Sequence, residues 1–225
     1  MCDFREACAT YRLLREKGYP EKATLKLVAD RHRLSRTQRN CLFRGVMSTD
    51  VAANRRARLV SPAAVAGETL ALDWYNILIT VESYLHGETL FVADDGVVRD
   101  ASATHGSYRT GAATPRAMQE ILAMIERLGP GTVEVYIDQP ISFSARMAED
   151  LRGLLAERPW PGGDARVTLA QSADFPLKAS TGIVASSDSA VLDRCGRAFD
   201  LARGVLEERF HFSPPAIHDL FPGSP

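Results

Sequence analysis

The chain has 225 residues, of which 45% are hydrophobic and 24% are charged, and its formal net charge is −1 at pH 7. This composition is that of an ordinary globular protein, with enough chain for one large domain or two small ones. From the charged start we expect no signal peptide, and no apolar run is long enough to span a bilayer. The four cysteines (Cys2, Cys8, Cys41 and Cys195) show no CxxC pair and no metal-finger spacing. We therefore expect reduced thiols, a cytoplasmic location and no membrane partner.

Three short helices are predicted in chain order within residues 1–50: residues 3–17, residues 21–32, and residues 36–44 after Ser35 as N-cap. The residues expected to face inward are Phe4, Cys8, Tyr11 and Leu14 in the first helix, Ala23, Leu27 and Val28 in the second, and Cys41 and Leu42 in the third. The outline is that of a helix-turn-helix module, although many three-helix modules have no nucleic-acid role.

Charge is distributed unevenly along the chain. Residues 1–58 hold 14 Lys and Arg against 6 Asp and Glu, a net charge of +8, whereas residues 59–225 hold 13 against 22, a net charge of −9. Such asymmetry suggests that the N-terminal part meets a polyanion. The arginines expected to contact nucleic acid are Arg33, Arg36, Arg39 and Arg44. Arginines that simply solvate helix faces are the alternative.

The rest of the chain is predicted to be a linker, an α/β domain and a tail. Residues 51–67 read as a linker, because Pro62, Gly67 and small residues interrupt any period. Over residues 68–211, short apolar runs alternate with helical stretches, which predicts a mainly parallel sheet flanked by helices in three layers. Residues 212–225 are rich in proline and are expected to be a surface or disordered tail.

Two helices and a hairpin are clearly marked within the α/β domain. One helix should begin with Thr114 as its cap and Pro115 at its first position, and should end at Gly129. Another is expected over residues 144–157. The Asp-Asp-Gly turn at residues 94–96, between β-rich arms, predicts a hairpin inserted into the α/β pattern.

Four aspartates occupy equivalent positions relative to the predicted strands. Asp73 ends LALD, Asp138 ends VYID, Asp188 ends IVASSD, and Asp174 follows the strand around residues 167–169. Carboxyl ends of parallel strands share one edge, where ligands bind, so these side chains are expected to converge. Converging carboxylates repel one another unless a cation compensates, and Mg²⁺ or Mn²⁺ prefers oxygen ligands. For any single one of them, helix N-capping is the simpler explanation.

Residues 69–202 resemble the PIN-like superfamily of metal-dependent ribonucleases, particularly its NYN branch. LALDWYNILI, residues 70–79, looks like that family's opening strand, in which an Asp is followed three residues later by an Asn. VASSDSAVLD, residues 184–193, is similar to its late Ser-x-Asp element, and VYIDQP, residues 135–140, looks like a middle strand ending in Asp. The whole chain also looks like a prokaryotic two-domain family that pairs such a domain with a helical N-terminus.

The resemblance implies roles for particular residues. Asp73 and Asp188 would bind the metal and, with Asn76 orienting water or phosphate, form the catalytic group. Ser186 would support Asp188 by hydrogen bonding, beside Ser187. The further candidate metal ligands are Asp138, Asp174 and Asp193.

The sequence also departs from the family pattern. Trp74 stands where the family usually has a small residue, and Ala190 stands where it often has a second acid. The family's helical Glu is not identified, with Glu82 and Glu120 as candidates by residue type alone.

Other polar residues are candidates for substrate binding. The HGSYR segment, residues 105–109, could offer Arg109, His105 and backbone amides to a phosphate, or it could be an ordinary surface loop. Lys178 could contact phosphate or pair with a carboxylate. GxGxxG and GxxxxGK[ST] are both absent, which argues against a dinucleotide enzyme or a P-loop NTPase.

The sequence therefore predicts a Mg²⁺- or Mn²⁺-dependent phosphodiesterase of the endoribonuclease type, acting on RNA, with DNA as the alternative polymer. The first rival is a nucleic-acid-binding adaptor with a degenerate, non-catalytic site, which Ala190 and Trp74 favour. The second is a phosphatase of small metabolites, although Asp73 lacks the second acid two residues later that such enzymes keep. A homo-oligomer is compatible with the sequence, which does not fix the oligomeric state.

Overall fold

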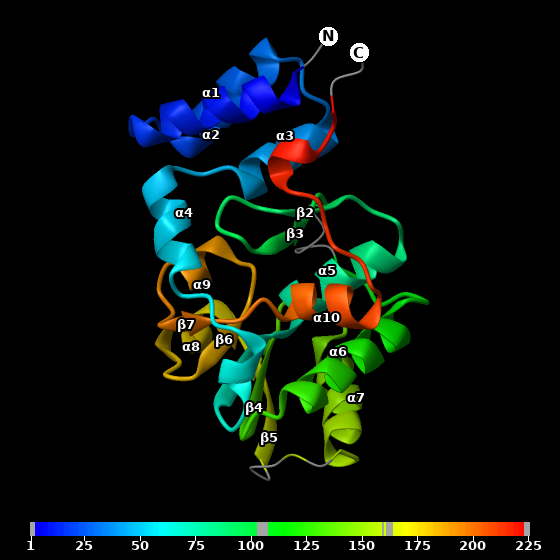
Figure 1. Cartoon of the computed structure of the whole chain (residues 1–225). Helices are drawn as coiled ribbons and strands as arrows, with labels where there is room; N and C mark the ends of the chain where they lie inside the picture. The colour runs from blue at the N-terminus through cyan, green and yellow to red at the C-terminus, as the bar shows by residue number, and fades with distance from the viewer. Residues whose placement is uncertain (1–2, 103–107, 159, 161–163, 223–225) are drawn as a thin grey trace. The chain divides into compact units, whose positions relative to one another are not determined.

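The computed structural model of the chain describes residues 3–102, 108–158, 160 and 164–222 (Figure 1). It contains two compact units. The helical unit comprises Met1–Ala57, Gly87–Ala103 and Ser213–Pro225, and the α/β unit comprises Arg58–His86 and Thr104–Phe212. Within the described residues, no helix combines the length and the apolar character needed to cross a membrane.

The α/β unit is built on a five-stranded sheet in the order β5-β4-β1-β6-β7, in which every neighbouring pair is parallel. The strands are β1 (Thr69–Asp73), β4 (Thr132–Asp138), β5 (Asp164–Ala170), β6 (Ile183–Ala185) and β7 (Arg197–Ala198). The central strands β1 and β6 are apolar and buried on both faces, as expected for a parallel sheet covered by helices. In β4, buried Val133, Val135 and Ile137 alternate with half-buried residues.

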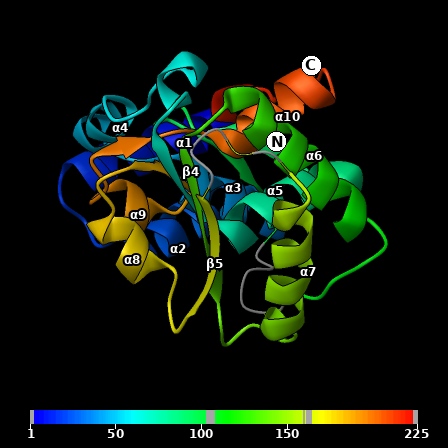
Figure 2. The ribbon, with the colours of Figure 1, turned by 90° about the horizontal axis from the view of Figure 1, so that it is seen from below.

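Helices cover both faces of this sheet. The helices of the unit are α5 (Trp74–Leu85), α6 (Thr114–Leu128), α7 (Ser144–Ala156), α8 (Asp174–Ala179), α9 (Ser189–Leu192) and α10 (Leu201–Arg209), with a 3₁₀ turn at Pro62–Val65. Figure 2 shows α8 and α9 on one side of β4 and β5, and α6 and α7 on the other. The three-layer α/β class predicted from the sequence is therefore confirmed.

The order of the strands reverses between β1 and β6. From β1 the chain passes to β4 and then β5 on one side, whereas β6 is followed by β7 on the other side. Such a reversal is the topological switch point of a doubly wound sheet, and ligands bind in the crevice outside the carboxyl ends of the two strands beside it. Asp73 ends β1, and Ser186 directly follows β6.

Local sequence signals explain the helix boundaries. Ser35 caps α3 (Arg36–Gly45) in a reciprocal capping box with Gln38, and Asp3 caps α1 (Phe4–Glu16) through the backbone N–H groups of Arg5 and Glu6, as these residue types do at helix starts. Gly129 ends α6 in the left-handed conformation, which glycine adopts without a Cβ penalty.

The helical unit contains more than the predicted three helices. Its elements are α1 (Phe4–Glu16), α2 (Glu21–Arg31), α3 (Arg36–Gly45), α4 (Thr49–Arg56), the antiparallel hairpin of β2 (Leu90–Val92) and β3 (Val98–Asp100), and a 3₁₀ turn at Ile217–Asp219. Its core joins Phe4, Tyr11 and Leu42 of the helices to Phe91 of the hairpin and Ile217 of the C-terminal segment.

Four features of the helical unit differ from the sequence prediction. Residues 49–56 are helical, although the predicted linker begins at residue 51. The hairpin forms as predicted but packs in the helical unit, and the C-terminal segment contributes buried Ile217 to the same core. The Leu27 side chain is 60% exposed and Ala23 is also exposed, so their predicted inward orientation was wrong, because α2 buries the face that carries Thr24 and Val28.

Candidate functional site at the sheet switch point

Asp73 lies directly at the switch point, at the carboxyl end of β1. It is the last residue of β1 and the N-cap residue of α5, but its side chain makes no cap hydrogen bond. Asp73 is 3% exposed, and its Oδ2 accepts a 2.7 Å hydrogen bond from the Ser186 hydroxyl. N-capping therefore does not explain Asp73, and its carboxylate faces the strand on the other side of the reversal.

Asn76 makes a second connection across the same point. Its Oδ1 accepts hydrogen bonds from both the backbone N–H, at 3.0 Å, and the hydroxyl of Ser187. The backbone donor identifies the bonded atom of Asn76 as oxygen, so the Nδ2 amide is turned away from Ser187. Within the described part of the chain this amide has no acceptor, and it remains available to a water or a phosphate.

Asp188 lies at the carboxyl edge of the sheet and also caps a helix. Its Oδ1 accepts from the backbone N–H groups of Ala190, at 2.7 Å, and Val191, at 3.1 Å, which caps α9. Its own backbone N–H donates to Ser186 Oγ at 3.0 Å. Ser186 thus holds the Asp73 carboxylate directly and Asp188 through the backbone, whereas the resemblance implied support of Asp188 alone.

The three other predicted aspartates have separate environments. Asp138 Oδ1 accepts from the Ala173 backbone N–H at 2.8 Å and so ties β4 to the loop after β5. Asp174 forms a 2.6 Å ion pair with Lys178 one helical turn later. Asp193 is an exposed residue at the end of α9. The edge carries the predicted acids, but several of them already serve as structural acceptors.

A metal site with many carboxylates is not found. Among the residues that the structure describes, no group of three or more His, Cys, Asp or Glu side chains is arranged to hold a metal ion. The predicted set of Asp73, Asp138, Asp174, Asp188 and Asp193 therefore does not form one cluster there. What the switch point provides is Asp73 and Asp188, linked through the Ser186 hydroxyl and backbone, with the Asn76 amide beside them.

Comparison with known proteins places the chain among relatives. The family described as "Domain of unknown function (DUF5616)" matches residues 62–204, and the family described as "Protein of unknown function (DUF434)" matches residues 3–58. The chain belongs to the DUF5616 family. It is also similar to "Uncharacterized protein MJ0935" of Methanocaldococcus jannaschii, with 25% identity over 182 residues, which are 81% of this chain and 85% of that protein. No solved structure matches the chain.

The two aromatic residues that follow Asp73, within the part of the chain that matches DUF5616, have buried side chains. Trp74 is fully buried in the core, so its ring does not stand in the way of a ligand at the sheet edge. Burial and the charge of Asp138 raise the pKa of Tyr75 to about 12. The Tyr75 ring also packs on that of Tyr108, with centroids 5.1 Å apart. Sequence reasoning missed Tyr75, which reads as an ordinary apolar position of α5.

Glu82, named from its residue type alone, is a buried acid of the DUF5616 region. Its carboxyl accepts hydrogen bonds from the hydroxyls of Tyr108, at 3.1 Å, and Thr114. Burial raises the pKa of Glu82, and the two hydroxyls oppose this shift. Because Glu82 lies nearly two turns along α5 from Asn76, we assign it a structural role. Glu120 forms a 2.7 Å ion pair with Arg209.

The predicted phosphate contacts are only partly near the switch point. A hollow of about 760 Å³ opens between α8 and α9, lined by Phe175, Lys178, Ala179, Ala190, Asp193 and Arg194. Lys178 belongs to this hollow but is paired with Asp174. Arg109 is exposed, and His105 lies outside the described residues.

In the part of the chain that matches DUF434, several arginines form ion pairs within the protein. Arg39 pairs with Asp30 at 2.9 Å, and Arg44 pairs with Asp100 at 2.9 Å. Arg33 and Arg36 are exposed and, in the described ranges, have no ion-pair partner. Two of the four predicted nucleic-acid contacts are therefore committed to internal pairs.

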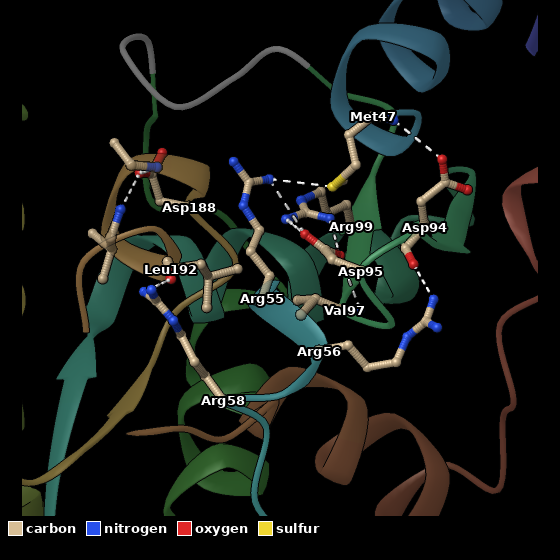
Figure 3. Close-up of polar contacts among 12 residues, drawn as sticks. Met47, Arg55, Arg56, Arg58, Asp94, Asp95, Val97, Arg99, Asp188 and Leu192 are labelled. Carbon is tan, nitrogen blue, oxygen red and sulfur yellow. Dashed lines mark hydrogen bonds and ion pairs between the residues drawn. The ribbon is translucent and has the colours of Figure 1, made fainter. Parts of the chain in front are cut away.

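The hairpin segment and the tail offset half of the positive charge of residues 1–58, and Arg58 belongs to the α/β unit. Asp94 pairs with Arg12 at 2.8 Å, and Figure 3 shows Arg55 and Arg99 converging on Asp95. The helical unit as a whole contains 14 Lys and Arg against 11 Asp and Glu, a net charge of +3. The asymmetry seen along the chain is thus reduced once distant segments come together.

Proposed function

We propose that this protein is a Mg²⁺- or Mn²⁺-dependent phosphodiesterase that acts on RNA. The observation that carries the proposal is Asp73: a buried carboxylate at a switch point, in an N-cap position that it does not use for capping, held by a hydroxyl from the neighbouring strand. A carboxylate oriented in this way is suited to a cation, because burying it otherwise costs free energy without serving the helix.

The donor set suits a hard divalent ion. All side-chain ligands at the switch point are oxygen donors, as Mg²⁺ and Mn²⁺ prefer. Mg²⁺ keeps several waters and needs only one or two protein carboxylates, so Asp73 with Asp188 is a sufficient protein contribution. When bound, the ion would activate water and neutralise charge on a phosphodiester.

The protein's own residues would orient the reactants. Ser186 fixes the direction of the Asp73 carboxylate by donating to its Oδ2. Asn76, whose Oδ1 is held by Ser187, would present its Nδ2 amide to a phosphate oxygen or to the attacking water. A cytoplasmic location fits this activity, and the free, buried thiols of Cys8, Cys41 and Cys195 support it.

The second candidate is a nucleic-acid-binding adaptor without catalysis. It is favoured by the lack, among the described side chains, of any group of three acids or histidines suited to a metal. Ala190 also supports it, because this position offers only a backbone N–H to Asp188 and a methyl group to the hollow. An adaptor would bind RNA equally well with and without a divalent ion.

The test is cleavage of single-stranded and hairpin RNAs with Mn²⁺, comparing wild type with Asp73→Asn and Asp188→Asn. Both substitutions leave the fold in place, because an amide oxygen at position 73 can still accept from Ser186 and one at position 188 can still cap α9, a role in which asparagine equals aspartate. Asp174→Asn is the matched control, since it removes the same charge from a residue paired with Lys178. We expect cleavage by wild type and by the control only. Equal cleavage by all four proteins rules out this site, and metal-independent binding without cleavage selects the adaptor.

A further inference from the structure

Two exposed phenylalanines mark the carboxyl edge of the sheet. Phe143 is 71% exposed and Phe175 is 81% exposed, the two highest values among the large hydrophobic residues of the described chain. Each stands five residues beyond the end of its strand, Phe143 after β4 and Phe175 after β5. One exposed large apolar side chain is common on protein surfaces, but two at the same distance beyond the ends of neighbouring strands call for an explanation.

Hydrogen bonds hold the two loops together. Gln171 Nε2 donates to Gln139 Oε1 at 2.9 Å, and the Gln139 backbone N–H donates to the Ala170 carbonyl at 2.8 Å. The Ala173 N–H donates to Asp138, as described above. Phe143 is the N-cap residue of α7 and Phe175 lies in α8, and these two helices cover opposite sides of β4 and β5 (Figure 2).

Each phenylalanine has an arginine for a neighbour. Arg146 follows Phe143 by three residues in the first turn of α7, and Arg194 lines the same hollow as Phe175. Both are exposed, and neither has an acidic partner among the residues described. The arginines of the α/β unit that do pair with an acid are Arg127, Arg158, Arg166, Arg197, Arg203 and Arg209. Arg146 and Arg194 are therefore cations that an external anion can reach.

The backbone of Phe143 is strained. Its φ is positive and its conformation is left-handed, which costs a bulky residue free energy that glycine would avoid. The exposed ring buries little surface in return. Strain at such a position suggests that the side chain is retained for contact with something else.

We propose that Phe143 with Arg146, and Phe175 with Arg194, form two nucleotide subsites that hold single-stranded RNA across the edge of β4 and β5. This inference rests on the proposed RNA substrate and adds the residues that position it. Each ring would stack on a base, and each guanidinium would contact a backbone phosphate. Bases paired in a duplex do not offer their faces to such rings, so the subsites select single strands.

The experiment measures binding of a fluorescein-labelled single-stranded oligo(U) RNA by anisotropy in EDTA, where no cleavage occurs. We expect Phe143→Ala and Phe175→Ala each to weaken binding about 5- to 150-fold, the range observed for loss of one stacked base. Tyrosine at either position should retain binding, whereas leucine should not. Arg146→Ala and Arg194→Ala should weaken binding and lower the slope of log K against log salt by about 1 each.

Two controls keep the interpretation sharp. Leu27→Ala removes another exposed apolar side chain, 60% exposed on α2, and Arg166→Ala removes a cation that is paired with Asp164. Both should bind like wild type. Wild-type affinity in Phe143→Ala and Phe175→Ala, or equal affinity for a duplex of the same length, overturns the proposal. Retention of RNA binding by the leucine variants would show that the rings do not stack on bases, and it also overturns the proposal.

The proposed function and this inference fail in different ways. If Asp73→Asn abolishes cleavage while the phenylalanine variants bind oligo(U) normally, the nuclease stands and the subsites fall. If the phenylalanine variants lose binding while cleavage never occurs, the subsites stand on an adaptor.

Discussion

Removing the Asp95 carboxylate should destabilise the helical unit far more than removing an exposed one. Asp95 is fully buried and accepts 2.7 Å hydrogen bonds from both Nη1 and Nη2 of Arg99, which is itself 2% exposed. Arg55 approaches Asp95 at 3.4 Å, and the Val97 backbone N–H donates to it at 3.2 Å (Figure 3). Asp95→Ala therefore leaves two largely buried guanidinium groups without this carboxylate.

The magnitude follows from the burial of these groups. Breaking a buried ion pair by removing one partner costs about 3–5 kcal/mol, because the remaining charge stays desolvated. For a unit of fewer than 100 residues, that corresponds to a fall in its Tm of about 12–40 °C. The matched control is Asp219→Ala, which breaks the ion pair with Arg5. The side chains of Arg5 and Asp219 are 70% and 62% exposed. An exposed pair of this kind contributes about 0–1 kcal/mol.

Thermal unfolding followed by circular dichroism measures both variants, and tryptophan fluorescence separates the units. Trp74 and Trp160 both belong to the α/β unit, so the fluorescence transition reports that unit alone. Equal Tm values for Asp95→Ala and Asp219→Ala would refute the reasoning.

The effect of acidification on the stability difference between wild type and Asp95→Ala has a definite direction. Burial alone would raise the pKa of Asp95, but the charge and hydrogen bonds of Arg99 outweigh it and lower the pKa below its ordinary value of 3.8. The stabilisation from Asp95 is therefore present above that ordinary value and lost as pH falls through the lowered pKa. The difference between wild type and Asp95→Ala should shrink on acidification.

Three further predictions concern the α/β unit. Burial raises the pKa of Glu82 above 4.5, so the stabilisation from its protonated carboxyl is complete below that value and is lost as pH rises. In urea unfolding, wild type should therefore lose stability relative to Glu82→Gln as pH rises from about 4 to 7. Parallel curves of stability against pH for the two proteins would contradict this. Phe143→Gly should raise the free energy of unfolding by about 1 kcal/mol by relieving left-handed strain, and a less stable variant would argue against strain. Gly131→Ala should cost about 1–3 kcal/mol in the same assay, because its Cβ would collide with the Gly67 carbonyl oxygen; a neutral effect would show that the backbone yields there.

Elements with local signals were predictable from the sequence. The Ser35 capping box and Gly129 define helix ends through residues within a turn of each other, and α3 and α6 end where expected to within one residue. Even there, one role was misjudged. Thr114 was predicted to cap α6, but its hydroxyl accepts from the Gly111 N–H and donates to Glu82, and Ala113 is the N-cap residue.

The packing of the hairpin was not predictable from local pattern. The Asp-Asp-Gly turn indicated the hairpin itself, but its place in the helical unit depends on contacts distant in sequence. Arg12 pairs with Asp94 82 residues away, and Arg44 pairs with Asp100 56 residues away. A charge count along the sequence reads these arginines as a basic surface, because it does not reveal which acids will meet them.

The candidate site was predicted in position but not in composition. Parallel strands bring Asp73 and Asp188 to one edge, as the alternation of strands and helices indicated. The sequence did not reveal that Asp138 accepts from the Ala173 N–H or that Asp188 caps α9. These hydrogen bonds depend on how the loops turn, and residue type and spacing do not fix that.

Binding of Mn²⁺ to the apo protein, measured by electron paramagnetic resonance, tests the central claim most directly. Free Mn²⁺ gives a sharp signal that broadens when the ion is bound, so the titration counts sites without requiring a substrate. We predict that wild type and Asp174→Asn bind Mn²⁺ and that Asp73→Asn does not. Equal binding by wild type and Asp73→Asn, or no binding by wild type, would contradict the assignment of Asp73 as a metal ligand.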